Sequence, residues 1–234
     1  MLEERGIPTV ALGSIRAQME KTRPPRGLWT SAALGRPVGE PEDKAFQRRV
    51  LLAALRLLER TDGPVILEDF PEDPPGLQDT PGWRGPALPV LTVTPTAPAA
   101  WAKSFEEELD LLMPLWRRAQ ARFGRTTVGL SFQQPDSWPG LAARFLAGEL
   151  PGVVGLDSPA LALRFMCDDV KALYGEAAQA EGPAPSPRQV DFWFWRETVA
   201  GQLLVALRIM AMASENNALK TVGGRFFVPT PWLP

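Results

Sequence analysis

Short apolar runs alternate with helical patterns over the first 70 residues. Residues 7–12 form an apolar, partly β-branched run that ends at Gly13-Ser14, which is typical of a buried strand. Residues 28–33 and 65–70 have the same character. Because strands separated by helices favour right-handed crossovers and a parallel sheet, this segment predicts an α/β fold with a Rossmann-like or flavodoxin-like parallel sheet layer.

Two helices are expected between these strands. Ser14 would be the N-cap of the first helix, which runs to about Thr22 and stops before Pro24-Pro25. The second helix has Pro41 in its first turn and ends at Asp62-Gly63-Pro64. Its apolar residues recur at i, i+3 and i+4, which places them on one face. That face consists of Phe46, Val50, Ala53, Ala54, Leu57 and Leu58.

Prolines interrupt the chain repeatedly from Pro71 to Pro98 and predict a long irregular connection. Trp83 and Leu88 favour an arm packed on a surface over a free tether, because a solvated linker rarely contains large apolar residues. The expected organisation therefore has three parts. They are an α/β half-domain over residues 1–70, a proline-rich arm or linker over residues 71–103, and a mainly helical region with one additional strand over residues 104–234.

Helical periodicity dominates the third part. Ser104-Phe105-Glu106-Glu107 is a capping-box pattern at the start of an apolar stripe that extends to Phe123. Residues 126–132 are expected to form the additional strand. Further helices are predicted over about 137–149, 159–178 and 188–213, and the last of them is expected to be the buried core helix.

The composition excludes several kinds of chemistry. Histidine is absent and Cys167 is the only cysteine, so an internal disulfide, a CxxC pair and the usual zinc, haem or copper sites are ruled out. We expect no metal and no cofactor. A net charge of -2 gives no electrostatic reason to expect nucleic acid as a partner. The charged N-terminus and the lack of an apolar run of ~20 residues predict a soluble cytoplasmic protein without a membrane partner.

The loop over residues 35–41 follows a strand and precedes a helix, where doubly wound folds bind ligands. Free N–H groups at the start of that helix could hold an anion, and Arg36 would add charge. A complete GxGxxG motif or P-loop is missing, so an ordinary turn is the main alternative. The candidate ligand-binding residues are Ser14, Gly35, Arg36, Gly39 and Glu40.

Cys167 is the one candidate catalytic thiol. It lies at the edge of the apolar face of a predicted helix, and Asp168 and Asp169 would raise its pKa, whereas a nucleophile needs positive neighbours. A buried, inert thiol is the favoured interpretation.

Two other segments also have a structural alternative. An acidic run after the third strand suits a cation or a substrate amine, but such runs are more often solvated loops. The aromatic run over residues 192–195 could line a pocket, but core or a subunit interface is more typical. The acidic run consists of Glu68, Asp69, Glu72 and Asp73.

Three segments together resemble one family. They are residues 4–10 (ERGIPTV), residues 35–41 (GRPVGEP) and residues 47–55 (QRRVLLAAL). Over roughly residues 3–60 the chain resembles the C-terminal part of the selenoprotein B component of glycine, sarcosine, betaine and D-proline reductases. That family is similar in a strand reading aGIPtV, a loop reading PLGdP and a helix that begins with basic residues. In the family, a redox selenocysteine or cysteine precedes this strand, and here its motif would lie before Met1.

The resemblance implies a reductase-related subunit that lacks its own redox residue and acts with a partner chain. The alternative is a noncatalytic structural or small-ligand-binding protein derived from that fold, and an enzyme that relies on Cys167 is the third possibility. The arm around Trp83 and the apolar tail over residues 226–234 also predict a homo-oligomer or a redox partner subunit, because exposed apolar patches mark interfaces.

Overall fold

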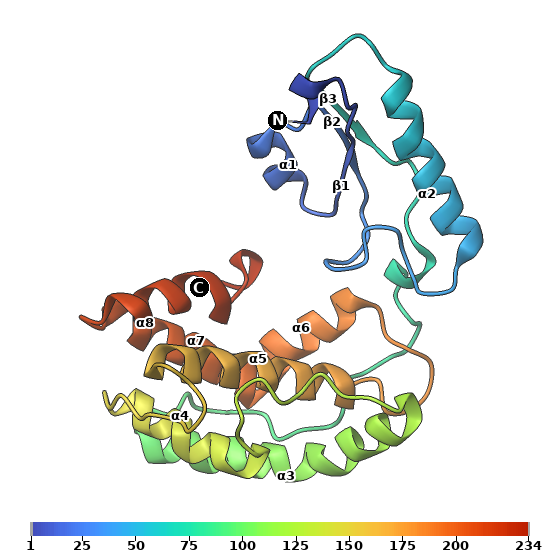
Figure 1. Cartoon of the computed structure of the whole chain (residues 1–234). Helices are drawn as coiled ribbons and strands as arrows, with labels where there is room; N and C mark the ends of the chain where they lie inside the picture. Colours follow the sequence, from blue (N-terminus) through green and yellow to red (C-terminus); the bar gives the residue numbers. More distant parts are fainter. Residues whose placement is uncertain (1, 234) are drawn as a thin grey trace. The chain divides into compact units, whose positions relative to one another are not determined.

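The computed structural model describes residues 2–233, and the chain divides into two compact units (Figure 1). The first, called here the α/β unit, comprises Met1–Asp79 with Ser186–Arg188. The second, called the helical unit, comprises Thr80–Pro185 with Gln189–Pro234. None of the described helices is long and apolar enough to cross a membrane.

Three short parallel strands form the sheet of the α/β unit in the order β1-β2-β3. They are β1 (Ala11–Gly13), β2 (Arg26–Trp29) and β3 (Ile66–Asp69). The expected α/β class and parallel sheet are confirmed. Strand β1 begins later than residue 7, because Thr9 donates its backbone N–H to a carboxylate oxygen of Glu3 at 2.5 Å rather than to a neighbouring strand.

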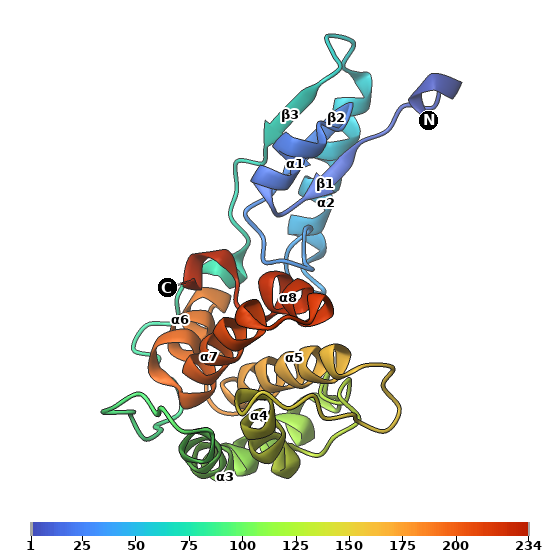
Figure 2. The same cartoon turned by 90° about the vertical axis from the view of Figure 1, so that its left-hand side faces the viewer.

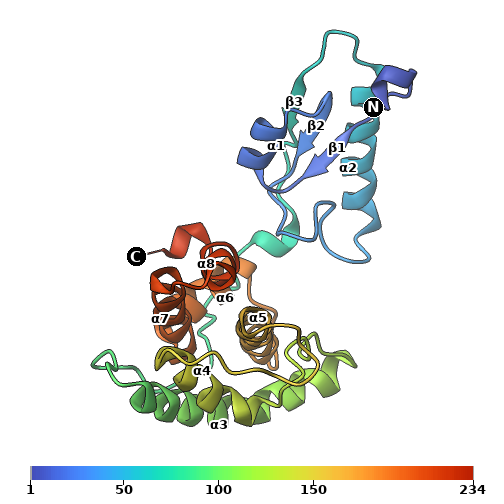
Figure 3. The same ribbon diagram turned by 60° about the vertical axis from the view of Figure 1, so that its left-hand side comes forward.

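Helices α1 (Arg16–Thr22) and α2 (Lys44–Arg56) cover opposite faces of this sheet (Figure 3). Adjacent residues of β2 point to opposite faces. Gly27 packs against Met19 of α1, whereas Leu28 belongs to the core that includes Phe46 of α2.

Since the strands are in sequential order and the helices lie on opposite faces, the two crossovers have opposite hands. The expectation of right-handed crossovers throughout is therefore wrong for one of them. A doubly wound sheet instead reverses its strand order where it changes face. Gly13 and Gly27 allow the Met19 side chain of α1 to lie close against this face of the sheet.

Both helix starts differ from the predicted caps. The N-cap position of α1 is occupied by Ile15, which makes no side-chain cap, and not by Ser14. The carbonyl of Ser14 instead accepts the indole N–H of Trp29 at 3.2 Å. Helix α2 begins after Asp43, whose carboxylate accepts the N–H of Phe46 at 3.0 Å. This capping carboxylate sets the start of α2 and leaves Pro41 before the helix.

The helical unit is built around α3, which packs against α4, α5 and α7 (Figure 2). Its core includes the fully buried side chains of Phe105, Trp138 and Tyr174. The helices are α3 (Pro98–Phe123), α4 (Trp138–Leu146), α5 (Pro159–Ala177), most of α6 (Pro187–Glu197), α7 (Val199–Ala213) and α8 (Asn217–Val222).

Helices α4 and α5 confirm the prediction, but three other expectations for this unit are wrong. Helix α3 begins at Pro98, ahead of the capping-box pattern, because proline suits a first helical turn. The helix expected over residues 188–213 is divided at Thr198, whose hydroxyl donates to the carbonyl of Phe194 and accepts the N–H of Gly201. No strand is found over residues 126–132, or elsewhere in the helical unit within residues 80–233.

The proline-rich arm packs on the helical unit's own core. Trp83, Leu88 and Leu91 lie against that core, and Trp193 lies so close over Gly85 that any side chain there would overlap its ring. The expectation of a packed arm is therefore confirmed. Val90 and Val93 of the arm stay exposed, so the predicted oligomer stays a prediction.

Candidate functional site

The predicted ligand-binding residues lie at the carboxyl edge of the parallel sheet. Thr30, which is fully buried, connects the end of β1 to the loop after β2. Its N–H donates to the carbonyl of Gly13 at 3.0 Å, and its hydroxyl donates to the carbonyl of Pro37 at 2.8 Å. No motif in the sequence singled out this threonine, although it follows a strand end.

The loop over residues 35–41 is held by its own polar groups. Gly35 and Gly39 have φ of 86° and 87°, a conformation that favours glycine. Arg36 forms an ion pair with Glu40, and the carboxylate of Asp43 caps the first turn of α2. The groups expected to hold an anion are thus engaged within the loop.

Ser14 differs from the rest of this edge. Its hydroxyl oxygen is buried and has no hydrogen-bond partner among residues 2–233. A buried hydroxyl without a partner is costly, so it is the group here with free capacity to bind something else.

The acidic run after β3 lies exposed at the surface, which agrees with the solvated segment that the sequence favoured over a cation site. Each of its carboxylates has a protein partner. Within the described part of the chain, no group of acids, cysteines and histidines could hold a metal ion. The pairs are Asp69 with Arg16, Glu72 with Arg49, Glu68 with Arg60, and Asp73 with the Ser31 hydroxyl.

Cys167 lies on α5 with no exposed surface. Burial raises the pKa of its thiol to about 12, Lys171 lowers the pKa and Asp168 raises it. The thiol is therefore protonated at neutral pH and shielded from solvent, as the favoured interpretation expected. The carboxylate of Asp169, which was also expected to raise this pKa, is hydrogen-bonded to the segment before Phe132.

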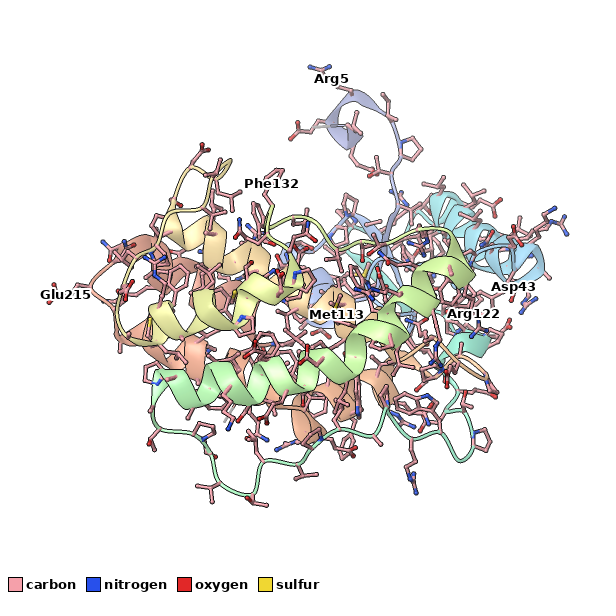
Figure 4. The ribbon with its side chains drawn as sticks, turned by 90° about the horizontal axis from the view of Figure 1, so that it is seen from below. Arg5, Asp43, Met113, Arg122, Phe132 and Glu215 are labelled. Atoms are coloured by element: carbon pink, nitrogen blue, oxygen red, sulfur yellow. The ribbon has the colours of Figure 1, made fainter. Side chains whose placement is uncertain are left out.

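That carboxylate organises the segment that was predicted to be a strand. Asp169 is fully buried and accepts the N–H groups of Gly129, Leu130 and Ser131 at 2.9, 3.0 and 2.9 Å, together with the Ser131 hydroxyl at 2.6 Å. Side-chain acceptors thus replace a partner strand. The next residue, Phe132, projects outward with 67% of its surface exposed (Figure 4).

Glu176, two turns further along α5, holds the preceding residues. It accepts the N–H and hydroxyl of Thr127, the hydroxyl of Thr126 and the indole N–H of Trp116. Burial opposes ionisation of Glu176, but these hydrogen bonds outweigh burial and lower its pKa. The two carboxylates together fix the course of residues 126–131.

A third carboxylate, Glu108 of α3, is fully buried at the start of α7. It accepts the N–H groups of Val199 and Ala200 at 2.7 and 2.9 Å and the hydroxyl of Tyr174 at 2.6 Å. Burial raises the pKa of Glu108, and these three bonds offset part of the increase. Because Tyr174 is also fully buried, the group joins helices and has no access for a substrate.

The helical unit also contains two pockets that the sequence did not predict. One, of about 310 Å³, has three indole walls and is called here the tryptophan pocket. The other, of about 460 Å³, lies beside Met113 of α3 and has Glu106, Asp110, Asp136 and Arg117 along its lining. The tryptophan pocket is lined by Trp101, Trp195, Arg196, Gln202, Ala206 and Trp232, among others. The aromatic run over residues 192–195 was the available signal, since it supplies Trp195.

No family model, no curated protein and no solved structure matches this chain. The resemblance to the reductase selenoprotein B component therefore stays a prediction that rests on three sequence segments.

Proposed function

We propose that the protein is a reductase-related subunit, similar to the selenoprotein B component of glycine reductase, which acts with a partner chain that carries the redox thiol or selenol. One observation supports this proposal above others. The loop over residues 35–41 is tied through Thr30 to the end of β1, the strand that follows the matching residues 4–10. Two of the matching segments thus lead to one edge of the sheet. A Rossmann-like or flavodoxin-like origin of this layer belongs to the same proposal.

The state of Cys167 supports assigning the redox group to another chain. A fully buried thiol with a pKa raised to about 12 reacts slowly as a nucleophile or reductant. In the proposed complex, the partner's thiol or selenol acts at the carboxyl edge. We assign binding of a polar substrate at this edge to the Ser14 hydroxyl, which has no partner among the described residues, and to the Arg36–Glu40 pair. We place this complex in the cytoplasm.

Native mass spectrometry of the complex purified from its source tests the proposal. We expect a stoichiometric second chain with a cysteine or selenocysteine that iodoacetamide alkylates rapidly at neutral pH, while Cys167 stays unmodified. Arg36→Ala should weaken the complex at least tenfold, because Arg36 and its partner Glu40 shape the edge loop. Arg225→Ala, at an exposed position of the helical unit, is the matched control. A purified chain without such a partner, or a complex insensitive to Arg36→Ala, would contradict the proposal.

The second candidate is a noncatalytic small-ligand-binding protein. The tryptophan pocket favours it, because small-molecule sites are mostly apolar concavities with a few polar groups, and this pocket has that composition. Ligand binding by the isolated chain, without any partner, distinguishes this candidate from the first.

A further inference from the structure

We infer that the tryptophan pocket binds a flat, mainly apolar molecule that carries one negative charge, with an aromatic carboxylate as the simplest class. Every residue that lines the pocket belongs to the helical unit. The inference therefore does not rest on the proposed reductase function, which concerns the sheet edge of the α/β unit.

The walls of the pocket are indole rings already fixed by packing. Trp101 of α3 is 4% exposed and Trp195 of α6 is 7% exposed, so neither ring can move aside freely. Phe194 packs edge-on against Trp195 at 4.8 Å, and Phe192 packs edge-on against Trp232 at 6.3 Å. Because these side chains are already ordered, they lose little conformational entropy when a flat ring enters the pocket.

The size of the pocket limits the ligand. A volume of about 310 Å³ is at the lower end of the range of about 300–1,000 Å³ typical of small-molecule sites. One or two fused rings fit such a space, whereas a long acyl chain or a nucleotide does not. Ala206 of α7 contributes only a methyl group to the lining, which leaves that side open to a ring.

The polar groups of the pocket select an anion. Arg196 has no carboxylate partner among residues 2–233, unlike Arg16 and Arg49 of the α/β unit, and its guanidinium lies 5.5 Å from the centre of the Trp232 ring. The side-chain amide of Gln202 likewise has no hydrogen bond within the described part of the chain. None of the described residues that line the pocket is acidic. A planar guanidinium beside an amide donor is well suited to a carboxylate.

The same groups disfavour a cation, although three indoles could form a cage for a quaternary ammonium. The positive charge of Arg196 already lies over the face of Trp232, and it would repel a second cation. With no carboxylate in the lining, nothing offsets that repulsion. The geometry and the charge therefore agree on an aromatic anion.

Isothermal titration calorimetry of the whole chain tests the inference with three probes of similar size: 2-naphthoate, its neutral amide, and benzyltrimethylammonium. We expect 2-naphthoate to bind with a Kd below about 1 mM. The amide should bind at least tenfold more weakly, because it cannot form the charged pair with Arg196. Benzyltrimethylammonium should show no binding in the same range.

Two variants assign the binding to this pocket. Arg196→Gln removes the charge but keeps a donor, and it should weaken naphthoate binding at least tenfold while leaving the amide unchanged. Ala206→Phe fills the cavity without removing a wall, and it should abolish binding of every probe. Arg225→Gln, at an exposed arginine outside the pocket lining, should bind like the wild type. Circular dichroism of each variant verifies that it is folded.

Three results would overturn the inference: no binding of naphthoate at millimolar concentration, binding that Arg196→Gln and Ala206→Phe leave intact in the folded protein, or tighter binding of the ammonium probe. Because the experiment needs no partner chain, its failure would leave the proposed reductase-related function untouched. Equally, absence of a redox partner would leave this site untouched.

Discussion

The two units of the molecule differ in their buried carboxylates, although both have exposed ion pairs such as Arg49–Glu72 and Arg144–Glu149. In the α/β unit, Asp69 and Glu72 pair with arginines of other elements and lie about half exposed. In the helical unit, Glu108 and Asp169 are fully buried and accept backbone N–H groups. The first arrangement connects elements across the surface, and the second replaces regular backbone pairing in the interior.

The size of the two cores explains the difference. The α/β unit has a small core beneath one face of a three-stranded sheet, and the exposed face of α2 still carries Leu51, Leu52 and Leu55. Such a core offers no interior in which a carboxylate could be enclosed. Helices α3, α4, α5 and α7 enclose a much larger core. There an irregular segment such as residues 126–131 can be held as firmly as a helix, provided that each buried donor has an acceptor.

Among the changes that test this difference between the units, loss of the Asp169 carboxylate should lower the free energy of unfolding most. Asp169→Ala leaves the N–H groups of residues 129–131 without acceptors in a buried setting. We expect the free energy of unfolding to fall by about 3 kcal/mol or more, since hydrogen bonds to a charged group are worth about 1.5–3 kcal/mol each. Urea denaturation measures the loss, and amide exchange should show that residues 126–131 are exposed first.

Asp169→Asn is the matched control, because it keeps the shape of the side chain but places an amide N–H₂ against N–H donors. It should destabilise the protein by an intermediate amount. A loss below about 1 kcal/mol for Asp169→Ala would mean that the segment is held by its apolar contacts instead.

Local pattern predicted the elements whose partners are local. The stripe of Phe46 and Val50 identified α2, and the run before Phe70 identified β3, because periodicity alone specifies which face is buried. The burial of Cys167 also followed from its helical stripe. The hands of the crossovers did not follow, because they depend on which face of the sheet each helix packs against, and local periodicity does not specify that face.

The segment over residues 126–132 shows why the remaining features were missed. Its threonines and valine have the character of a strand, but a strand also needs a neighbouring strand. Its donors are satisfied instead by Asp169 and Glu176, which are more than 35 positions away in the sequence. Glu108 offered a usable signal, because an acid between Phe105 and Leu112 on the packing face of a helix must have a buried partner.

Removal of the Glu108–Tyr174 hydrogen bond should cause the next largest loss in the free energy of unfolding. Tyr174→Phe removes a buried donor to the carboxylate, and we expect a loss of about 1–2 kcal/mol in the free energy of unfolding. Glu108 also makes stability depend on pH. Because burial raises its pKa in the folded protein, the folded state binds a proton more readily than the unfolded state.

The resulting contribution to stability is complete below the ordinary pKa of 4.5 and is lost as the pH rises through the folded value. Glu108→Gln removes this dependence. The stability advantage of the wild type over Glu108→Gln should therefore shrink as the pH rises from about 4.5 towards neutrality. Urea denaturation of both proteins at a series of pH values measures this difference in the free energy of unfolding. An advantage that grows with pH would show that the hydrogen bonds outweigh burial at Glu108, as they do at Glu176.

The surface ion pairs of the α/β unit should have the smallest effect. Arg49 donates to the Glu72 carboxylate from Nε at 3.0 Å and from Nη2 at 2.8 Å, but both side chains are about half exposed, so water and ions screen the pair. Arg49→Gln should speed amide exchange of α2 slightly at low salt. The difference should vanish in about 1 M NaCl, where the screening length is ~3 Å.

Arg225→Gln, at an exposed arginine of the other unit, should change nothing at either salt concentration. If Arg49→Gln were as damaging as Asp169→Ala, or insensitive to salt, the α/β unit would depend on its ion pairs after all, and the contrast between the two units would be lost.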